Sequence, residues 1–152
     1  MYTQKGYQQF HTLTSPSQRG IKGCGAYCND QQIFVAQRPL DQSVVSISDY
    51  SHIHAKHSIL QHKMMEKLYP KIARIRMFGA ACIDFSYVAS GKTDATICGT
   101  GFYWDIAAGR LLCSEAGAKV VNIYGNDFSM NDYYAIAVSS DELMKLLISL
   151  HE

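Results

Sequence analysis

One carboxylate stands at the junction between a strand-like run and a helix-like run of this chain. Asp105 follows the strand-like segment Thr93–Cys98 and opens a helix-like segment that closes at Gly117. A carboxylate at the start of a helix can cap the free backbone N–H groups there, or it can turn outward and hold a hard cation through oxygen. The residue types alone leave both interpretations of Asp105 open.

A second place where the chain could do chemistry is a glycine turn. Gly79 lies between the alternating run Lys71–Met77 and a helix-like segment with Ala81 and Val88 on one face. A strand, a glycine turn and a helix N-terminus together form a ready anion site, because the free N–H groups of the helix point outward. Gly79 could equally serve only to permit a tight turn, so this alternative stays open.

Three segments of the sequence carry a resemblance to a known family. They are residues 76–95 (RMFGAACIDFSYVASGKTDA), 104–109 (WDIAAG) and 114–120 (SEAGAKV). In this order and spacing they resemble the C-terminal half of the inositol monophosphatase family, whose members are magnesium-dependent phosphatases of phosphorylated small molecules. The resemblance implies that Asp105 is one metal ligand among several, with Mg²⁺ as cofactor. It also implies that Gly79, Ala80 and Ala81 line the substrate pocket.

The chain departs from the family pattern in two ways. The family builds most of its metal site from a Glu-Glu pair and an Asp-Pro-x-Asp-Gly-Thr/Ser loop, and neither occurs in this sequence. The family also has a glutamate that contacts substrate seven residues before the aspartate matched by Asp105, and Cys98 stands at that position. A thiol is a weak donor and acceptor with no charge near neutrality. We therefore expect Cys98 to line the substrate pocket as a small residue, without acting as a nucleophile.

These departures lead to two hypotheses about function. In the first, the chain is half of a phosphomonoesterase, and one carboxylate is too few to hold Mg²⁺ tightly, so the isolated chain is inactive. In the second, it is a non-catalytic, truncated family member that acts as a dimerisation or protein-interaction module. Strands such as Gln32–Ala36 would lack their family neighbours, and an open strand edge recruits partners. The expected partner is a second copy or the missing N-terminal half.

Other clusters of metal-ligating residue types give weaker indications. Cys24 and Cys28 have no second Cys or His pair at the spacing of a zinc site. His54 and His57 would lie one turn apart on a helix, but no carboxylate follows at a matching spacing. We expect no physiological metal site at either cluster.

Composition limits the class of protein. With 152 residues, of which 47% are hydrophobic, the chain is long enough to bury roughly 70% of its unfolded surface in one core. A net charge of +1 without a basic block argues against nucleic acid as a partner. No apolar run approaches the roughly 18 residues of a membrane span, and the N-terminus lacks a secretory apolar region. Five cysteines without a paired framework indicate a reducing, cytoplasmic location.

The alternation of strand-like and helix-like segments predicts an α/β fold, with a mainly parallel or mixed sheet flanked by helices. By resemblance this is the second domain of the family's layered α/β sandwich, over residues 38–152. Residues 1–37 would be a loop and remnant strands of the first domain, and the polar stretch 8–20 is expected to be a loop. The predicted strands are 42–48, 71–77, 93–98, 119–124 and 133–138, and the predicted helices are 54–69, 81–89, 105–116 and 141–150.

Overall fold

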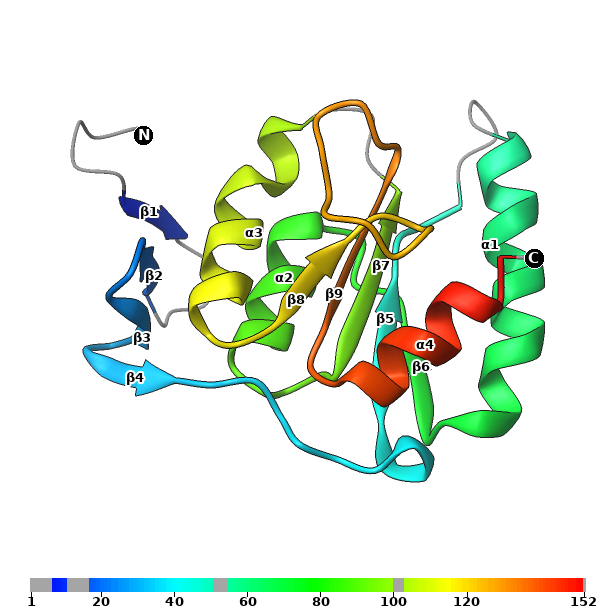
Figure 1. Cartoon of the computed structure of the whole chain (residues 1–152), viewed down its shortest axis with the longest axis horizontal. Helices are drawn as coiled ribbons and strands as arrows, with labels where there is room; N and C mark the ends of the chain where they lie inside the picture. The colour runs from blue at the N-terminus through cyan, green and yellow to red at the C-terminus, as the bar shows by residue number, and fades with distance from the viewer. Residues whose placement is uncertain (1–6, 11–16, 51–54, 100–102, 152) are drawn as a thin grey trace.

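The computed structural model describes residues 7–10, 17–50, 55–99 and 103–151. It contains two sheets, one antiparallel and one mixed, with helices on both faces of the mixed sheet (Figure 1). The first sheet comprises β1 (Tyr7–Phe10), β2 (Gln18–Ile21), β3 (Gly25–Cys28) and β4 (Gln31–Ile33). The second comprises β5 (Val44–Ile47), β6 (Arg74–Arg76), β7 (Ala95–Gly99), β8 (Lys119–Val121) and β9 (Tyr134–Val138). The helices are α1 (Ala55–Leu68), α2 (Ala81–Ala89), α3 (Trp104–Glu115) and α4 (Asp141–Ser149), with short 3₁₀ turns at Leu40–Gln42 and Tyr69–Lys71.

The second sheet has the strand order β6-β5-β7-β9-β8 and is mixed, as predicted. β5 runs parallel to both β6 and β7, whereas β9 runs antiparallel to β7 and β8. The carboxyl ends of β5, β6 and β7 therefore meet at one edge of the sheet. In α/β sheets, ligands bind outside such an edge.

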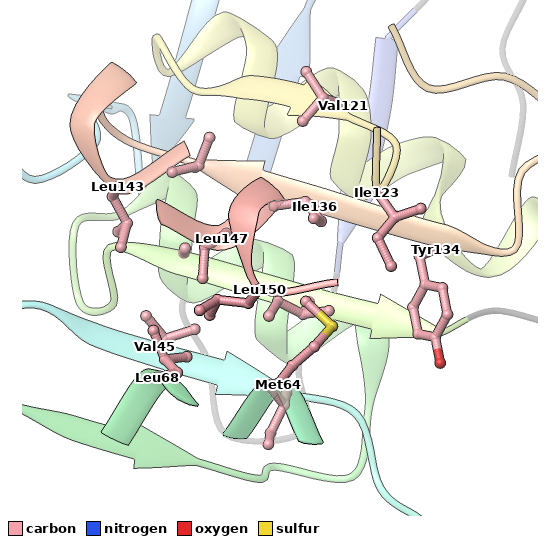
Figure 2. Packing of buried hydrophobic residues seen from close by; sticks show 14 of the residues in the cluster. Val45, Met64, Leu68, Val121, Ile123, Tyr134, Ile136, Leu143, Leu147 and Leu150 are labelled. Atoms are coloured by element: carbon pink, nitrogen blue, oxygen red, sulfur yellow. The ribbon is translucent and has the colours of Figure 1, made fainter. Parts of the chain in front are cut away.

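Each face of this sheet is covered by its own pair of helices. Val45 and Ile97 point to the face that α1 and α4 cover, where Met64 and Leu147 belong to the same buried cluster (Figure 2). Cys98 points to the opposite face and packs in a second cluster with residues of α2 and α3. This alternation is the ordinary period of two along a strand, applied to a sheet with two buried faces.

The two helices on the second face pack closely. α2 and α3 make contact where Gly109 of α3 meets Phe85 of α2, because a Cβ atom at Gly109 would lie 2.6 Å from the Phe85 Cβ. Only a residue without a side chain fits at this crossing. The crossing therefore fixes how the two helices lie against each other.

The first sheet forms an outer layer beyond α3 (Figure 1). The carboxylate of Glu115, the last residue of α3, accepts hydrogen bonds from the backbone N–H groups of Gly23 and Gly25, both at 2.8 Å. Two bonds to one ionised carboxylate are strong hydrogen bonds. They hold the turn between β2 and β3 against the end of α3.

The prediction of a loop over residues 8–20 was wrong where the structure describes them. β1 and β2 occupy residues 7–10 and 18–21 and pair antiparallel, with Tyr7 opposite Ile21, while residues 11–16 lie outside the described part. Their sequences, YQQF and QRGI, show no sustained hydrophobic alternation, so periodicity does not reveal these strands, which form by pairing with neighbouring strands. β8 is also shorter than predicted, because the Asn122 side chain accepts bonds from Tyr124 N and Asn126 N and starts a turn.

The other predicted strands and helices are confirmed to within a few residues. Ser140 caps α4, its hydroxyl accepting a bond from Leu143 N at 3.2 Å, as the capping pattern indicated. β4 pairs on one side only, with β3, so the expected open edge is present among the described strands. Within the described residues, no helix is both long and apolar enough to cross a membrane.

The amino end of the second sheet is fixed by one buried carboxylate. Asp94 is fully buried, and its Oδ2 atom accepts bonds from Arg38 Nη1 at 2.9 Å and from Val44 N at 2.8 Å. The same guanidinium donates from Nη2 to Gly91 O at 2.7 Å. One ion pair thus ties the approach to β5, the approach to β7 and the end of α2 together.

We predict that Asp94→Asn lowers the free energy of unfolding by about 2–3 kcal/mol, because it removes a buried charge that its partners need. Asp141→Asn is the matched control: it also removes one negative charge, but from the exposed pair with Lys119 at 2.6 Å. The control should change stability little. Urea unfolding of both variants measures the difference, and equal effects would contradict the assigned role of Asp94.

Candidate functional site

Four segments bring chemically capable groups to the carboxyl edge of the parallel strands. Asp49 follows β5, Gly79 follows β6, Gly99 ends β7, and Asp105 lies in the first turn of α3. Their positions follow from the topology, since parallel strands end at the same edge and each is followed by a loop or a helix N-terminus. This edge is the candidate site.

Position 79 requires a glycine for two reasons: the conformation of its backbone and the closeness of a carboxylate. Its φ angle is +74°, a left-handed conformation that glycine adopts without a steric penalty. A Cβ atom on Gly79 would lie 2.9 Å from Asp49 Oδ2, which is too close for a real contact. The turn therefore exposes its backbone directly beside a negative charge.

The N-terminus of α2 follows this turn. Its N-cap residue is Ala80, which provides no side-chain hydrogen bond to the helix. The amides of Ala81 and Cys82 have no acceptor one turn back within the helix. Ala80 and Ala81 also carry only methyl side chains, so a bound group can approach these amides closely. The arrangement suits an anion with several acceptor oxygens, such as a phosphate.

Asp84 lies on the same helix, one turn further on, and faces the sheet. It is 1% exposed, and its Oδ1 atom has no hydrogen-bond partner among the described residues. Burial raises the pKa of this carboxyl to about 6, the nearby Ser46 hydroxyl lowers it in part, and the negative charge of Asp49 raises it further. Asp84 is therefore a carboxyl that changes protonation state in the range below neutral pH.

Cys98 is buried in the second cluster, at 3% exposure, and lies close enough to two carboxylates to sense their charge. Burial raises the pKa of its thiol to about 12, with additional contributions from Asp84 and Asp105. At neutral pH the thiol is protonated and is not a nucleophile. This agrees with the interpretation of Cys98 as a small, uncharged residue, while its contact with a substrate stays a prediction.

Asp105 is exposed and is the second residue of α3. The N-cap position belongs to Tyr103, and no side chain caps the helix there. Asp105 is therefore not the N-cap residue of α3, which leaves the ligand interpretation open as a prediction. The positive end of the helix dipole also stabilises its negative charge.

The oxygen donors at this edge are of the type that Mg²⁺ prefers, but the described residues supply too few of them to form a complete site. Asp49 and Asp105 offer carboxylate oxygens, which Mg²⁺ prefers. In the described ranges, however, no three His, Cys, Asp or Glu residues lie together as a metal site would need. His62 pairs with Glu66 at 3.7 Å on the surface of α1, and Cys24 and Cys28 are free thiols. His52 and His54 lie outside the described residues.

Comparison with known proteins decides the family. The model of the inositol monophosphatase family matches residues 11–152. The chain belongs to the inositol monophosphatase family. Among curated relatives, a fructose-1,6-bisphosphatase of Pyrococcus furiosus is 33% identical over 150 residues, covering 94% of this chain and 54% of that protein. A fructose-1,6-bisphosphatase/inositol-1-monophosphatase of Thermotoga maritima is 30% identical over 130 residues, covering 83% of this chain and 48% of that protein.

Solved structures of family members share the fold. The extragenic suppressor protein suhB from Bartonella henselae superposes with a TM-score of 0.86 at 26% identity, over 95% of this chain and 57% of that chain. The Thermotoga maritima IMPase TM1415 gives a TM-score of 0.82 at 25% identity, over 95% and 56%. The α/β sandwich architecture is confirmed. The chain spans about half the length of the relatives it matches.

The structure brings the sequence-predicted residues Gly79, Ala80, Ala81, Cys98 and Asp105 to one edge. It adds two carboxyl groups that sequence reasoning missed. Asp49 comes two residues after the β-branched run of β5, and a polar residue just past a buried parallel strand is the signal that could have found it. The signal for Asp84 was an acid on the packing face of a predicted helix.

We predict that the stability of the chain falls as pH rises from about 4 to about 6. The pKa of Asp84 is raised from 3.8 to about 6 in the folded state, so the folded state binds the additional proton across this window and loses that stabilisation once Asp84 ionises. Asp84→Asn cannot ionise, so its stability relative to the wild type should rise by about 1–3 kcal/mol between pH 4 and pH 7.

Urea unfolding at several pH values measures this difference. Asp41→Asn, which removes an exposed carboxylate, serves as the control and should track the wild type. A pH-independent difference between the wild type and Asp84→Asn would contradict the assignment.

Proposed function

We propose that the chain forms the phosphate-binding half of a magnesium-dependent phosphomonoesterase site, and that it has no turnover on its own. The observation that carries this proposal is the uncapped N-terminus of α2 beside the Asp49 carboxylate, at the edge where Asp105 also lies. Membership in the inositol monophosphatase family supports it. The substrate class is a phosphorylated small molecule.

The charges at this edge argue for a cation between protein and substrate. A phosphate at the amides of Ala81 and Cys82 would lie near the negative charge of Asp49, because Asp49 Oδ2 lies against Gly79. Two like charges in one site repel each other, and either a proton on one group or a cation between them relieves the repulsion. Asp49 and Asp105 would hold a divalent cation at this edge, and its positive charge would offset the repulsion while the helix amides stay available to the phosphate.

The groups of this chain would have separate tasks. The Gly79–Ala81 backbone would donate hydrogen bonds to phosphoryl oxygens and orient the ester, and Asp105 would supply one oxygen to the metal. Bound Mg²⁺ would polarise the phosphoryl group and favour formation of hydroxide from water. Cys98 would contribute shape without charge, so it offers a substrate hydroxyl no strong acceptor.

The number of oxygen donors explains the proposed inactivity. Magnesium requires near-octahedral coordination with several oxygen ligands. Asp49 and Asp105 are the carboxylates that this edge exposes in the described part of the chain, and the relatives that the chain matches are about twice as long. The remaining donors would come from a complementing polypeptide or a second copy. The five free cysteines support a reducing, cytoplasmic location for such an assembly.

We predict that Mg²⁺ and phosphate bind together to the isolated chain, with dissociation constants of about 1 mM or weaker. In ¹H–¹⁵N correlation spectra, the pair should shift the amide resonances of Gly79–Cys82 and Asp105. Asp105→Asn should abolish the magnesium dependence of these shifts. A phosphomonoester added with Mg²⁺ should not be hydrolysed measurably.

Asp41→Asn is the control for a lost surface carboxylate and should leave the shifts unchanged. Magnesium-dependent hydrolysis that Asp105→Asn does not alter would refute the proposal. Shifts caused by phosphate that map elsewhere on the chain would refute the placement of the anion at α2.

The open edge of the first sheet supports a second candidate function, that of an interaction module. β4 is an edge strand of the first sheet, and Phe34, which follows it, is 61% exposed. An open edge next to an exposed aromatic ring favours association with another polypeptide, and this supports a role as a non-catalytic dimerisation or protein-interaction module. The two candidates differ in whether the carboxyl edge of the second sheet is used.

We predict that the chain self-associates through this edge in solution, as measured by light scattering during size-exclusion chromatography. Phe34→Lys should shift the population toward monomer, because a charge beside the edge strand opposes pairing. Tyr69→Lys introduces the same charge at another exposed ring, 68% accessible, and should have no effect. A wild-type chain that is monomeric at all concentrations would exclude the self-associating form of the module.

A further inference from the structure

A cavity of about 420 Å³ lies outside the candidate phosphate site. It is open on one side and is bordered by the start of α1, the loop between β8 and β9, and the residues after α4, and its lining includes His57, Asn122, Tyr124, Asp132 and His151. Figure 1 shows the end of α4 beside α1. Figure 2 shows Ile123 and Tyr134, two further lining residues, beside each other at one end of the hydrophobic cluster. The volume is in the range of small-molecule pockets.

The cavity contains one carboxylate whose orientation is fixed. Asp132 Oδ2 accepts bonds from Ser129 N at 2.8 Å and from Ser129 Oγ at 2.9 Å, and Oδ1 accepts one from Asn122 Nδ2 at 3.1 Å. The backbone bond from Ser129 is the largest cause that lowers the pKa of Asp132. The group therefore stays ionised at neutral pH, and its donors hold it in one position.

Aromatic rings form the walls around this charge. The imidazole of His57 stacks on Tyr133, with ring centroids 3.5 Å apart and an angle of 9° between the planes. Tyr124 meets His151 edge to face, with centroids 5.2 Å apart and an angle of 85°. The Tyr134 hydroxyl donates to His57 O at 2.8 Å, which fixes the start of α1 against this wall. Tyr124 is 67% exposed, so its ring is accessible to a ligand.

The charge balance of the lining selects a type of ligand. Among the described residues, the lining contains one carboxylate and no lysine or arginine. The faces of tyrosine rings carry partial negative charge, and a cation placed over them is attracted electrostatically. A carboxylate together with aromatic walls is the combination that binds ammonium groups, whereas a free phosphate would be repelled.

We propose that this cavity is a second ligand site, which binds a small organic cation with a substituted ammonium group. The ammonium group lies over the Tyr124 ring and faces the Asp132 carboxylate, and the apolar part of the ligand contacts Leu60 and Ile123. This site differs from the proposed phosphate site in the charge of the ligand that it would bind, a cation instead of an anion. The two are nevertheless neighbours, since a Cβ atom on Gly99 at the end of β7 would lie 3.0 Å from Tyr133 Cε1.

Choline and 3,3-dimethyl-1-butanol test the proposal as a matched pair, because they have the same shape and differ in the positive charge. Titration of the full chain at pH 8, followed by ¹H–¹⁵N correlation spectra, should show choline binding with a dissociation constant of about 1–10 mM. The shifted amides should be those of residues 122–134 and the start of α1. The neutral alcohol should bind at least about tenfold more weakly.

Two variants and one control variant test which residues of the lining bind choline. Tyr124→Leu keeps an apolar side chain and should weaken choline binding about three- to tenfold. Asp132→Asn should weaken it by about tenfold, but the loss of its bonds could also disturb the loop, so Tyr124→Leu is the decisive variant. Tyr69→Leu changes an equally exposed tyrosine outside the cavity and should leave binding unchanged.

Equal binding of choline and the alcohol would overturn the proposal, since the cavity would then recognise apolar shape alone. Unchanged choline affinity in Tyr124→Leu would also overturn it, as would shifts that map outside the cavity. The absence of any choline-induced shift up to about 100 mM would exclude recognition of this class of ligand. None of these outcomes depends on whether the chain binds phosphate.

Discussion

The arrangement of the second sheet depends on the ion pair between Arg38 and Asp94. Asp94 has no exposed surface, so its charge must be compensated inside the protein, and the guanidinium with the Val44 amide provides that compensation. Because Val44 begins β5 and Asp94 precedes β7, the pair sets the register of two parallel strands at their amino ends. The positions of Asp49 and Gly99 at the opposite ends then follow from strand length.

The site at those opposite ends uses groups that are individually ordinary. An uncapped helix N-terminus attracts anions, and a carboxylate attracts cations, so their placement side by side favours a metal-bridged anion over either alone. The thiol of Cys98 is protonated near neutral pH and adds no charge at this edge, whereas the buried Asp84, with a pKa of about 6, is mostly ionised there.

Most of the second sheet could be predicted from sequence, whereas in the first sheet only the strand at β4 was predicted, as Gln32–Ala36. Hydrophobic runs such as β5 and β9 and the amphipathic α1 carry a local pattern that burial dictates. β1 and β2 are short, show no sustained hydrophobic alternation, and form by pairing with each other and with β3. Gly79 and Asp105 could be singled out because a turn and a helix start have local signatures. Asp49 has a weaker local signal, its position just past the buried strand β5, because its role depends on how close β5 and β6 lie, and this is a property of the sheet.

The contact between Gly109 and Phe85 has a consequence for the dimensions of the site. α2 supplies the amides that face an anion and α3 supplies Asp105, and the two helices touch where one residue lacks a side chain. The span between the amides and the carboxylate is therefore set by a van der Waals contact in the interior. Any larger residue at position 109 would push the helices apart. The size of the group that fits between them is thus encoded at a position that no ligand touches.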